Sequence, residues 1–262
     1  MGTAVTNKRM LKFAGFALTK YAGQISYLSR KHIASLHWEM ANMNTEQKYI
    51  DSHDFFKREP DWSYARLMVA LCLIKLQKYE SAKNNCLVAL ENCSFRGGPG
   101  YQTFIFTSQI EKLPELFVFS GQPESFHKTL ITELNEYKKD ERGKSLIAHY
   151  AYALQNLLYG EDVEALTHCE PLVKRPKIKD MFAIGETIRA IVEKDQQAFD
   201  KALDLLLLAH RGMAKQGSLR ESPEGFLSMP GISLSYIAYS RGLSINTVNE
   251  YLPVSYLDFL NK

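Results

Sequence analysis

The sequence predicts an all-α protein of about ten helices, and three observations support this fold class. First, the 262 residues include only 15 Gly and 9 Pro, which is too few for an all-β protein with many tight turns. Second, three stretches, 62–92, 149–173 and 182–208, carry apolar residues at helical spacing around a short polar turn. Third, equivalent alanines in the last two stretches, Ala165 and Ala198, lie 33 positions apart, as expected of a repeated helical unit.

The stretch 62–92 predicts two helices joined by a tight turn at 77–79. Its small and aromatic residues resemble the packing positions of a tetratricopeptide hairpin, in which alanines let two antiparallel helices approach closely and an aromatic ring fills the gap at the turn. The positions concerned are Ala65, Ala70, Tyr79, Ala82 and Ala89-Leu90.

The same hairpin pattern returns twice further along the chain. In the second hairpin, Gly160 is expected to end the first helix and Asp162 to cap the second, while Ala165 takes the place of Ala82. In the third, Lys194-Asp195 forms the turn and Ala198 takes the same place. The first two copies are 83 residues apart, so we predict tetratricopeptide-like hairpins rather than a regular tandem array.

The segment between the first two hairpins contains the strongest break in the chain, Arg96–Gly100, followed by the strand-like stretch Tyr101–Thr107. A loop and Pro123 then lead into an amphipathic helix over Ser125–Asp140. We predict a single all-α domain over residues 1–262. The 96–100 loop is the candidate internal boundary, and a loop within one helical domain is the alternative.

The net charge is +3, from 32 Lys and Arg against 29 Asp and Glu. This near-balance argues against a nucleic-acid partner or an anionic membrane surface, because either would favour a basic stripe. The charge is uneven, however, with a net of +6 over residues 1–100 and −3 over residues 101–262.

The chain is expected to be cytoplasmic. Its longest apolar runs, Met68–Ile74 and Leu205–Ala209, are far shorter than the ~20 residues of a membrane span. The apolar stretch Phe13–Thr19 follows Lys8-Arg9 as in a signal peptide, but lysines bracket it and no clear cleavage site follows, so an ordinary N-terminal helix is predicted. The four cysteines form no Cys-x-x-Cys pair and are predicted to be buried free thiols: Cys72, Cys86, Cys93 and Cys169.

No motif in the sequence predicts catalysis, a cofactor or a metal. The nucleophile elbow, the phosphate-binding loop and the His-Glu-x-x-His zinc motif do not occur. The Gly97–Gly100 stretch lacks the Lys-Ser/Thr and the helix N-terminus that a phosphate site needs, so a simple loop is expected. His168-Cys169-Glu170 offers three ligand types, but neighbouring helical residues point about 100° apart and do not converge on one ion.

Leu234–Leu252 resembles the helix-turn-helix of response-regulator transcription factors, which would make the chain a DNA-binding regulator. The second helix of that motif would be Ser244–Leu252, which has no Lys or Arg, carries Glu250 and is stopped by Pro253. The favoured alternative is one helix, a glycine cap at Gly242 and an extended segment ending in Tyr-Leu-Pro.

The last third of the chain, most clearly residues 194–255, resembles the immunity protein 49 family, whose members are mostly helical proteins that bacteria encode beside polymorphic toxins delivered to competitors. The stripe Phe199, Leu203, Leu206 and His210 falls on one helix face, so the matching residues are expected to hold the fold. They are Asp195, Phe199, Leu203, Leu206, His210, Ser222–Leu227, Leu234, Ala238, Arg241–Leu243 and Tyr251–Pro253.

The resemblance implies that the chain is not an enzyme and that it binds and neutralises a cognate toxin domain, which is expected to be the product of the adjacent gene. Residues 111–170 have a net charge of −5, which suggests an acidic patch that meets the toxin. A solvated helix face is the simpler interpretation of these charges. An adaptor that binds a peptide in a concave groove is the alternative function. The candidate toxin-binding residues are Glu133, Glu136, Asp140, Glu141, Glu161, Asp162 and Glu164.

Overall fold

The computed structural model describes residues 61–93, 110–139, 141–220 and 222–262. These residues form ten α-helices and three 3-10 turns, and they contain no strand beyond one isolated bridge between Asn249 and Leu252. The all-α prediction is confirmed. The elements in chain order are α5 (Asp61–Lys75), α6 (Tyr79–Cys93), α8 (Leu113–Phe119), η1 (Glu124–Phe126), α9 (His127–Tyr137), η2 (Glu141–Lys144), α10 (Leu146–Tyr159), α11 (Asp162–Val173), α12 (Lys179–Glu193), α13 (Gln196–Gln216), η3 (Pro223–Phe226), α14 (Met229–Ser240) and α15 (Val254–Leu260).

The three predicted hairpins are α5–α6, α10–α11 and α12–α13. Residues at two of their turns act as helix caps. Gly160 ends α10 in the left-handed conformation at φ 75°, which suits glycine. The Asp195 side chain caps α13 by accepting a hydrogen bond from the Ala198 backbone N–H at 2.9 Å. The predicted Asp162 cap is wrong, because Glu161 occupies the N-cap position of α11 and Asp162 bonds elsewhere.

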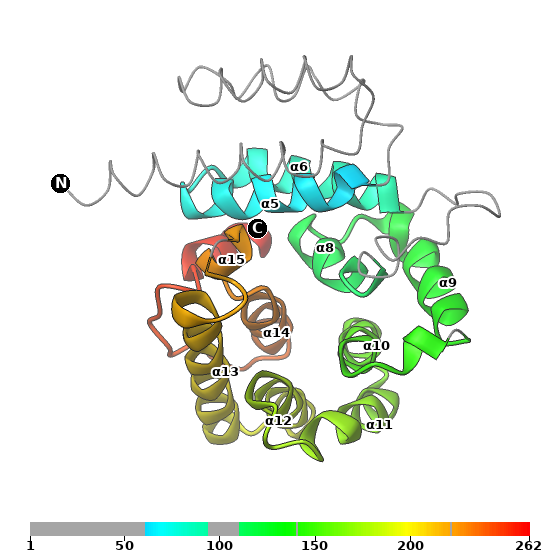
Figure 1. The fold of residues 1–262 in the computed structure, drawn as a ribbon, viewed down its shortest axis with the longest axis vertical. Helices are drawn as coiled ribbons and strands as arrows, with labels where there is room; N and C mark the ends of the chain where they lie inside the picture. Colours follow the sequence, from blue (N-terminus) through cyan, green and yellow to red (C-terminus); the bar gives the residue numbers. More distant parts are fainter. Residues whose placement is uncertain (1–60, 94–109, 140, 221) are drawn as a thin grey trace.

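The helices follow one another around a ring when the molecule is viewed down its shortest axis (Figure 1). α10 and α14 lie toward the middle, whereas α9, α11 and α13 lie on the outside. α14 is apolar all round and buried along nearly its whole length, as expected of a helix at the centre of a fold. Consecutive helices pack as hairpins, and their correspondence to a tetratricopeptide array stays a prediction.

The C-terminal segment closes the ring by returning to the first described helices. The Tyr256 hydroxyl donates a 2.9 Å hydrogen bond to the Phe119 carbonyl of α8, and the Tyr256 ring lies 5.3 Å from that of Tyr79 on α6. The hydroxyls of Tyr79 and Ser255 also share a hydrogen bond. Tyr79 thus packs against α15, so the aromatic residue at the first hairpin turn also joins the two ends of the described chain.

The helix-turn-helix alternative is wrong. After α14 the chain turns at Gly242, with φ 89°, and runs without helix through residues 243–252. Leu243 is buried, and the Tyr251 carbonyl accepts a 2.9 Å hydrogen bond from the Ser228 backbone N–H. Polar side chains of the segment bond to α13 as well, so it packs as an extended strap and provides no second helix for a DNA groove.

Several predictions lie outside the described residues: the N-terminal helix, the 96–100 boundary and the strand-like stretch Tyr101–Thr107. Of the cysteines, Cys72, Cys86 and Cys169 are buried free thiols as predicted. Burial raises the pKa of Cys72 to about 12, which keeps that thiol protonated and unreactive. None of the helices in these described ranges is both long and apolar enough to cross a membrane.

Candidate functional site

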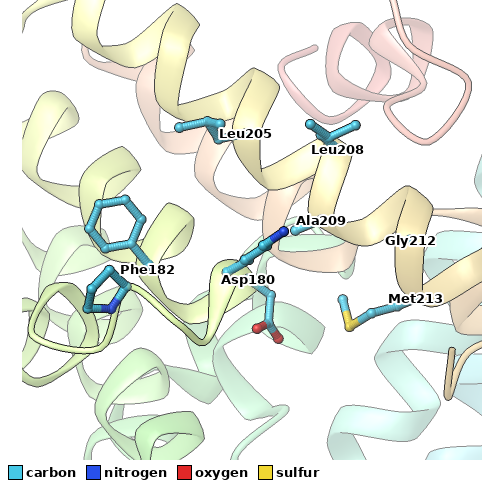
Figure 2. A pocket seen from close by; sticks show the side chains of 9 residues that line it. Asp180, Phe182, Leu205, Leu208, Ala209, Gly212 and Met213 are labelled. Carbon is cyan, nitrogen blue, oxygen red and sulfur yellow. The ribbon is translucent and has the colours of Figure 1, made fainter.

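A groove runs between α12 and α13 (Figure 2). Its main section has a volume of about 560 Å³ and a mostly apolar lining. Leu205 and Leu208 of α13 are 42% and 62% exposed, and Figure 2 shows Leu205 facing Phe182 of α12 across the groove. The lining residues are Pro176, Lys179, Asp180, Phe182, Leu205, Leu208, Ala209, Gly212 and Met213.

A second section of about 390 Å³ continues the groove toward the turn between the two helices. Phe182 and Leu205 line both sections, so the two form one surface. Along α13 this surface extends from Ala198 to Met213, which is ~22 Å at a helical rise of ~1.5 Å per residue. The groove therefore has the length of about four helical turns.

The exposed leucines are the part of α13 that the sequence analysis missed. The predicted buried stripe is confirmed, with Phe199, Leu203 and Leu206 at most 2% exposed and His210 at 4%. Leu205 and Leu208 lie off this stripe within a run of four leucines. Such a run places apolar side chains on more than one face of a helix, and this was the signal available in the sequence.

The charges around the groove differ between its two ends. At the end near the α11–α12 loop, Lys179 lines the groove, and Lys177 and Lys215 follow the lining residues Pro176 and Met213 closely in sequence. All three lysines are exposed and form no ion pair within the described ranges. At the other end, Glu186 and Arg189 pair at 3.0 Å, and Glu193 and Lys201 offset each other in formal charge. Asp180 lines the same section beside Lys179, so three lysines face one carboxylate and this end of the apolar groove has a net positive charge.

The predicted acidic residues lie on α9 and around the α10–α11 turn. Glu133 and Glu136 belong to α9, whereas Glu161 and Glu164 lie at the start of α11. The Glu136 carboxylate is exposed and bonds to Lys139 at 2.7 Å. Asp140 and the side chain of Glu141 lie outside the described residues.

Asp162, the remaining predicted acidic residue, takes part in an internal connection. The Arg241 guanidinium donates to the Asp162 carboxylate at 2.6 Å and to the Leu157 carbonyl at 2.7 Å. Arg241 is 16% exposed, so a partly buried cation joins the end of α14 to the end of α10 and the start of α11. Arg241 is also one of the residues on which the resemblance described in the sequence analysis rests.

We expect Arg241→Met to lower the free energy of unfolding by about 2 kcal/mol, because it removes two hydrogen bonds made by a charged group. Urea denaturation monitored by circular dichroism would measure the loss. Arg211→Met, at an exposed position of α13, is the control and should leave the stability unchanged within error. Equal stability of the Arg241 variant and the wild type would contradict the connecting role.

A charged cluster around the buried carboxylate of Glu115 joins α8, α10 and η3, and its other charged members, Lys112 and Glu224, are partly exposed. Lys112 Nζ lies 3.3 Å from Glu115 Oε2 and 3.6 Å from Glu224 Oε1, and the Tyr150 hydroxyl donates to Glu115 Oε1 at 3.0 Å. Burial raises the pKa of Glu115, and Lys112 and Tyr150 partly offset that increase. Burial alone would lower the pKa of Lys112, but the two carboxylates outweigh it and raise that pKa. The charged groups of the cluster contact one another, as expected of an ion-pair network that stabilises the fold.

The three potential metal ligands at 168–170 have three different partners. His168 Nδ1 lies 3.1 Å from His149 Nδ1, Cys169 Sγ donates to the Gly185 carbonyl, and Glu170 pairs with Lys174. The expected divergence of these side chains is therefore confirmed. Among the side chains that the structure describes, no group of three or more His, Cys, Asp or Glu could hold a metal ion.

Comparison with known families decides where this chain belongs. The model of the family described as Immunity protein 49 matches residues 119–255, which are 137 of the 262 residues. The chain belongs to the immunity protein 49 family. No curated protein and no solved structure matches it. The matched segment of this immunity protein contains both walls of the α12–α13 groove and all seven predicted acidic residues.

Proposed function

We propose that this immunity protein binds a cognate toxin domain and neutralises it by protein–protein contact, without catalysis of its own. The family match over residues 119–255 is the observation that carries the proposal. The exposed apolar groove supports it, because a contiguous apolar surface of this kind is typical of a protein-binding site. Binding would take place in the cytoplasm of the producing cell, with the toxin domain encoded by the adjacent gene.

Co-expression tests this function directly. The C-terminal domain encoded by the adjacent gene is expressed in a susceptible bacterium with and without this chain. We expect the chain to restore growth and to co-purify with the toxin domain as a stable complex. Failure to restore growth against the toxin domains of the neighbouring genes would refute the proposal.

A peptide-binding adaptor is the second candidate function, and the same groove favours it. The two functions differ in the growth assay, because an adaptor would not protect cells against a toxin. Protection together with a stable complex would therefore exclude the adaptor as the primary function.

We further propose that the acidic patch, defined by the predicted residues on α9 and α11, accelerates capture of the toxin. Opposite charge on two partners raises their association rate, and salt weakens the effect. The exposed members Glu161 and Glu164 suit this role because both lie at a helix start near one turn. Asp162 belongs to the same patch, although its carboxylate also bonds to Arg241.

Reversing two of these charges should slow toxin binding. We expect Glu161→Lys/Glu164→Lys to lower the association rate about tenfold at low salt, with little effect in 0.5 M salt. Stopped-flow mixing with the purified toxin domain measures the rate. The control, Glu80→Lys/Asp258→Lys, makes the same change in net charge at exposed positions on α6 and α15. Equal rates for both variants would show that net charge, rather than the patch, governs association.

A further inference from the structure

We propose that the α12–α13 groove binds an amphipathic α-helix of the toxin domain, with acidic residues of that helix placed beside Lys177, Lys179 and Lys215. This inference rests on the proposed function and assigns the part of the partner that the groove accepts. Three features of the groove carry it: its apolar lining, its helical walls and the charge at one end.

The apolar lining provides the central contact. Leu205 and Leu208 project from α13 with large exposed fractions, and Phe182 and Met213 line the same surface. Protein interfaces obtain most of their binding energy from a few well-packed apolar or aromatic anchors near their centre. Leu205 lines both sections of the groove, so it occupies such a central position.

The helical walls favour a helix over an extended segment. An extended peptide leaves its own backbone N–H and C=O groups unpaired unless it adds to the edge of a sheet. Helices α12 and α13 present no such edge, because their backbone groups bond within each helix. A bound helix pairs its own backbone groups internally and needs only apolar residues at i, i+4 and i+7 to fill the groove. The ~22 Å length accommodates about four turns of it.

The positive charge at one end of the groove favours an occupant with acidic residues and disfavours a second copy of this chain. A head-to-tail copy would place the neutral end of its groove, with its Glu186–Arg189 pair, beside the three lysines. A parallel copy would bring the two sets of lysines together. Neither arrangement brings a net negative charge to Lys177, Lys179 and Lys215, because the copy's own Asp180 is outnumbered by its lysines, whereas acidic residues on a toxin helix do.

Substitutions in the groove test the assignment on the full chain, with the purified toxin domain of the adjacent gene as the probe. We expect Leu208→Ser to raise the Kd about tenfold and Leu205→Ser/Leu208→Ser about 100-fold. Val248→Ser is the matched control, because Val248 is 99% exposed and lies outside the groove. Thermal unfolding verifies that each variant folds. An unchanged Kd for the double variant, with wild-type binding intact, would overturn the groove assignment and leave the proposed function standing.

Charge reversal tests the second half of the assignment. Lys179→Glu/Lys215→Glu should reduce the association rate with the same toxin domain about tenfold at low salt. The control, Lys78→Glu/Lys262→Glu, changes the net charge equally at exposed positions away from the groove. If both double variants bind at the same rate, the acidic-partner assignment is wrong.

A photocrosslinker identifies the occupant. Benzoylphenylalanine in place of Leu208 should crosslink to a toxin segment that has apolar residues at i, i+4 and i+7 and acidic residues at one end, whereas the same group in place of Val248 should not. A crosslink between two copies of this chain, or a dimer that Leu208→Ser dissociates, would overturn the proposal in favour of self-association. Absence of wild-type binding to the toxin domain would refute the proposed function itself, and this inference with it.

Discussion

Lys112→Met is expected to lower the free energy of unfolding by about 3–5 kcal/mol, because it leaves a buried carboxylate without its cation. Glu115 is completely buried in α8, and its partners are Lys112 and the Tyr150 hydroxyl. Glu224 also loses its cation at 3.6 Å. The isolated Glu115 must then take up a proton or remain charged in a medium of low polarity, and either response destabilises the folded state.

Two further variants separate the ion pair from side-chain packing. Glu115→Gln keeps an acceptor for Tyr150 while it removes the buried negative charge, so Lys112→Met/Glu115→Gln should regain at least about 2 kcal/mol of the loss. Lys174→Met is the matched control, because its exposed pair with Glu170 is open to solvent. We expect its stability to equal that of the wild type in urea denaturation. A loss of the same size in the single and double variants would show that packing of the Lys112 side chain, rather than charge, is responsible.

The sequence predicts much of this fold because helix formation depends on local signals. The 3.6-residue spacing, Gly160, Asp195 and the Phe199–His210 stripe act within a few residues of one another, and all of them are confirmed. The Asp162 cap is wrong for the opposite reason. Its carboxylate bonds to Arg241, 79 residues away, and no local pattern specifies such a partner.

The charged cluster around Glu115 could not be predicted from the sequence either, because its members also lie far apart along the chain. Lys112, Glu115, Tyr150 and Glu224 come from three separate parts of the chain, and their pairing depends on how α8, α10 and η3 pack against one another. The sequence shows which residues are charged, but it does not indicate which of the acidic residues is buried in the folded protein. One wall of the groove had a signal in the sequence, the run of four leucines, which the sequence analysis missed. The opposite wall depends on how α12 packs, and no local pattern specifies that packing.

The residues that carry the family resemblance support the groove rather than line it. Asp195 caps α13, Phe199 and Leu203 are buried in the core beneath it, and Arg241 fixes the end of α14. Leu205 and Leu208 are absent from that pattern and are exposed. We therefore expect substitutions at the exposed groove positions to leave the fold intact, whereas substitutions in this framework should destabilise it.

His210 should make the protein less stable in acid. It is 4% exposed, its ring lies 4.9 Å from that of Tyr251, and burial lowers its pKa to about 4. The Gly225 backbone and Glu224 favour the charged form of His210, and Lys112 disfavours it, but burial has the largest effect. Between pH 6.5 and about 4, the unfolded chain therefore binds a proton that the folded chain does not.

The free energy of unfolding should consequently fall by up to about 3 kcal/mol as the pH drops from 6.5 to 4, and the loss should level off below pH 4. Glu115 has the opposite effect, because its raised pKa adds stability as the pH falls. His210→Gln isolates the histidine, since it removes the titrating group and leaves Glu115 in place. Urea denaturation at intervals of half a pH unit should show that the free energy of unfolding falls less steeply with decreasing pH for His210→Gln than for the wild type.

His168→Gln provides the comparison, because burial also lowers the pKa of His168 to about 4, but its side chain is only half-buried. Parallel curves for His210→Gln and the wild type would mean that His210 keeps an ordinary pKa in the folded protein.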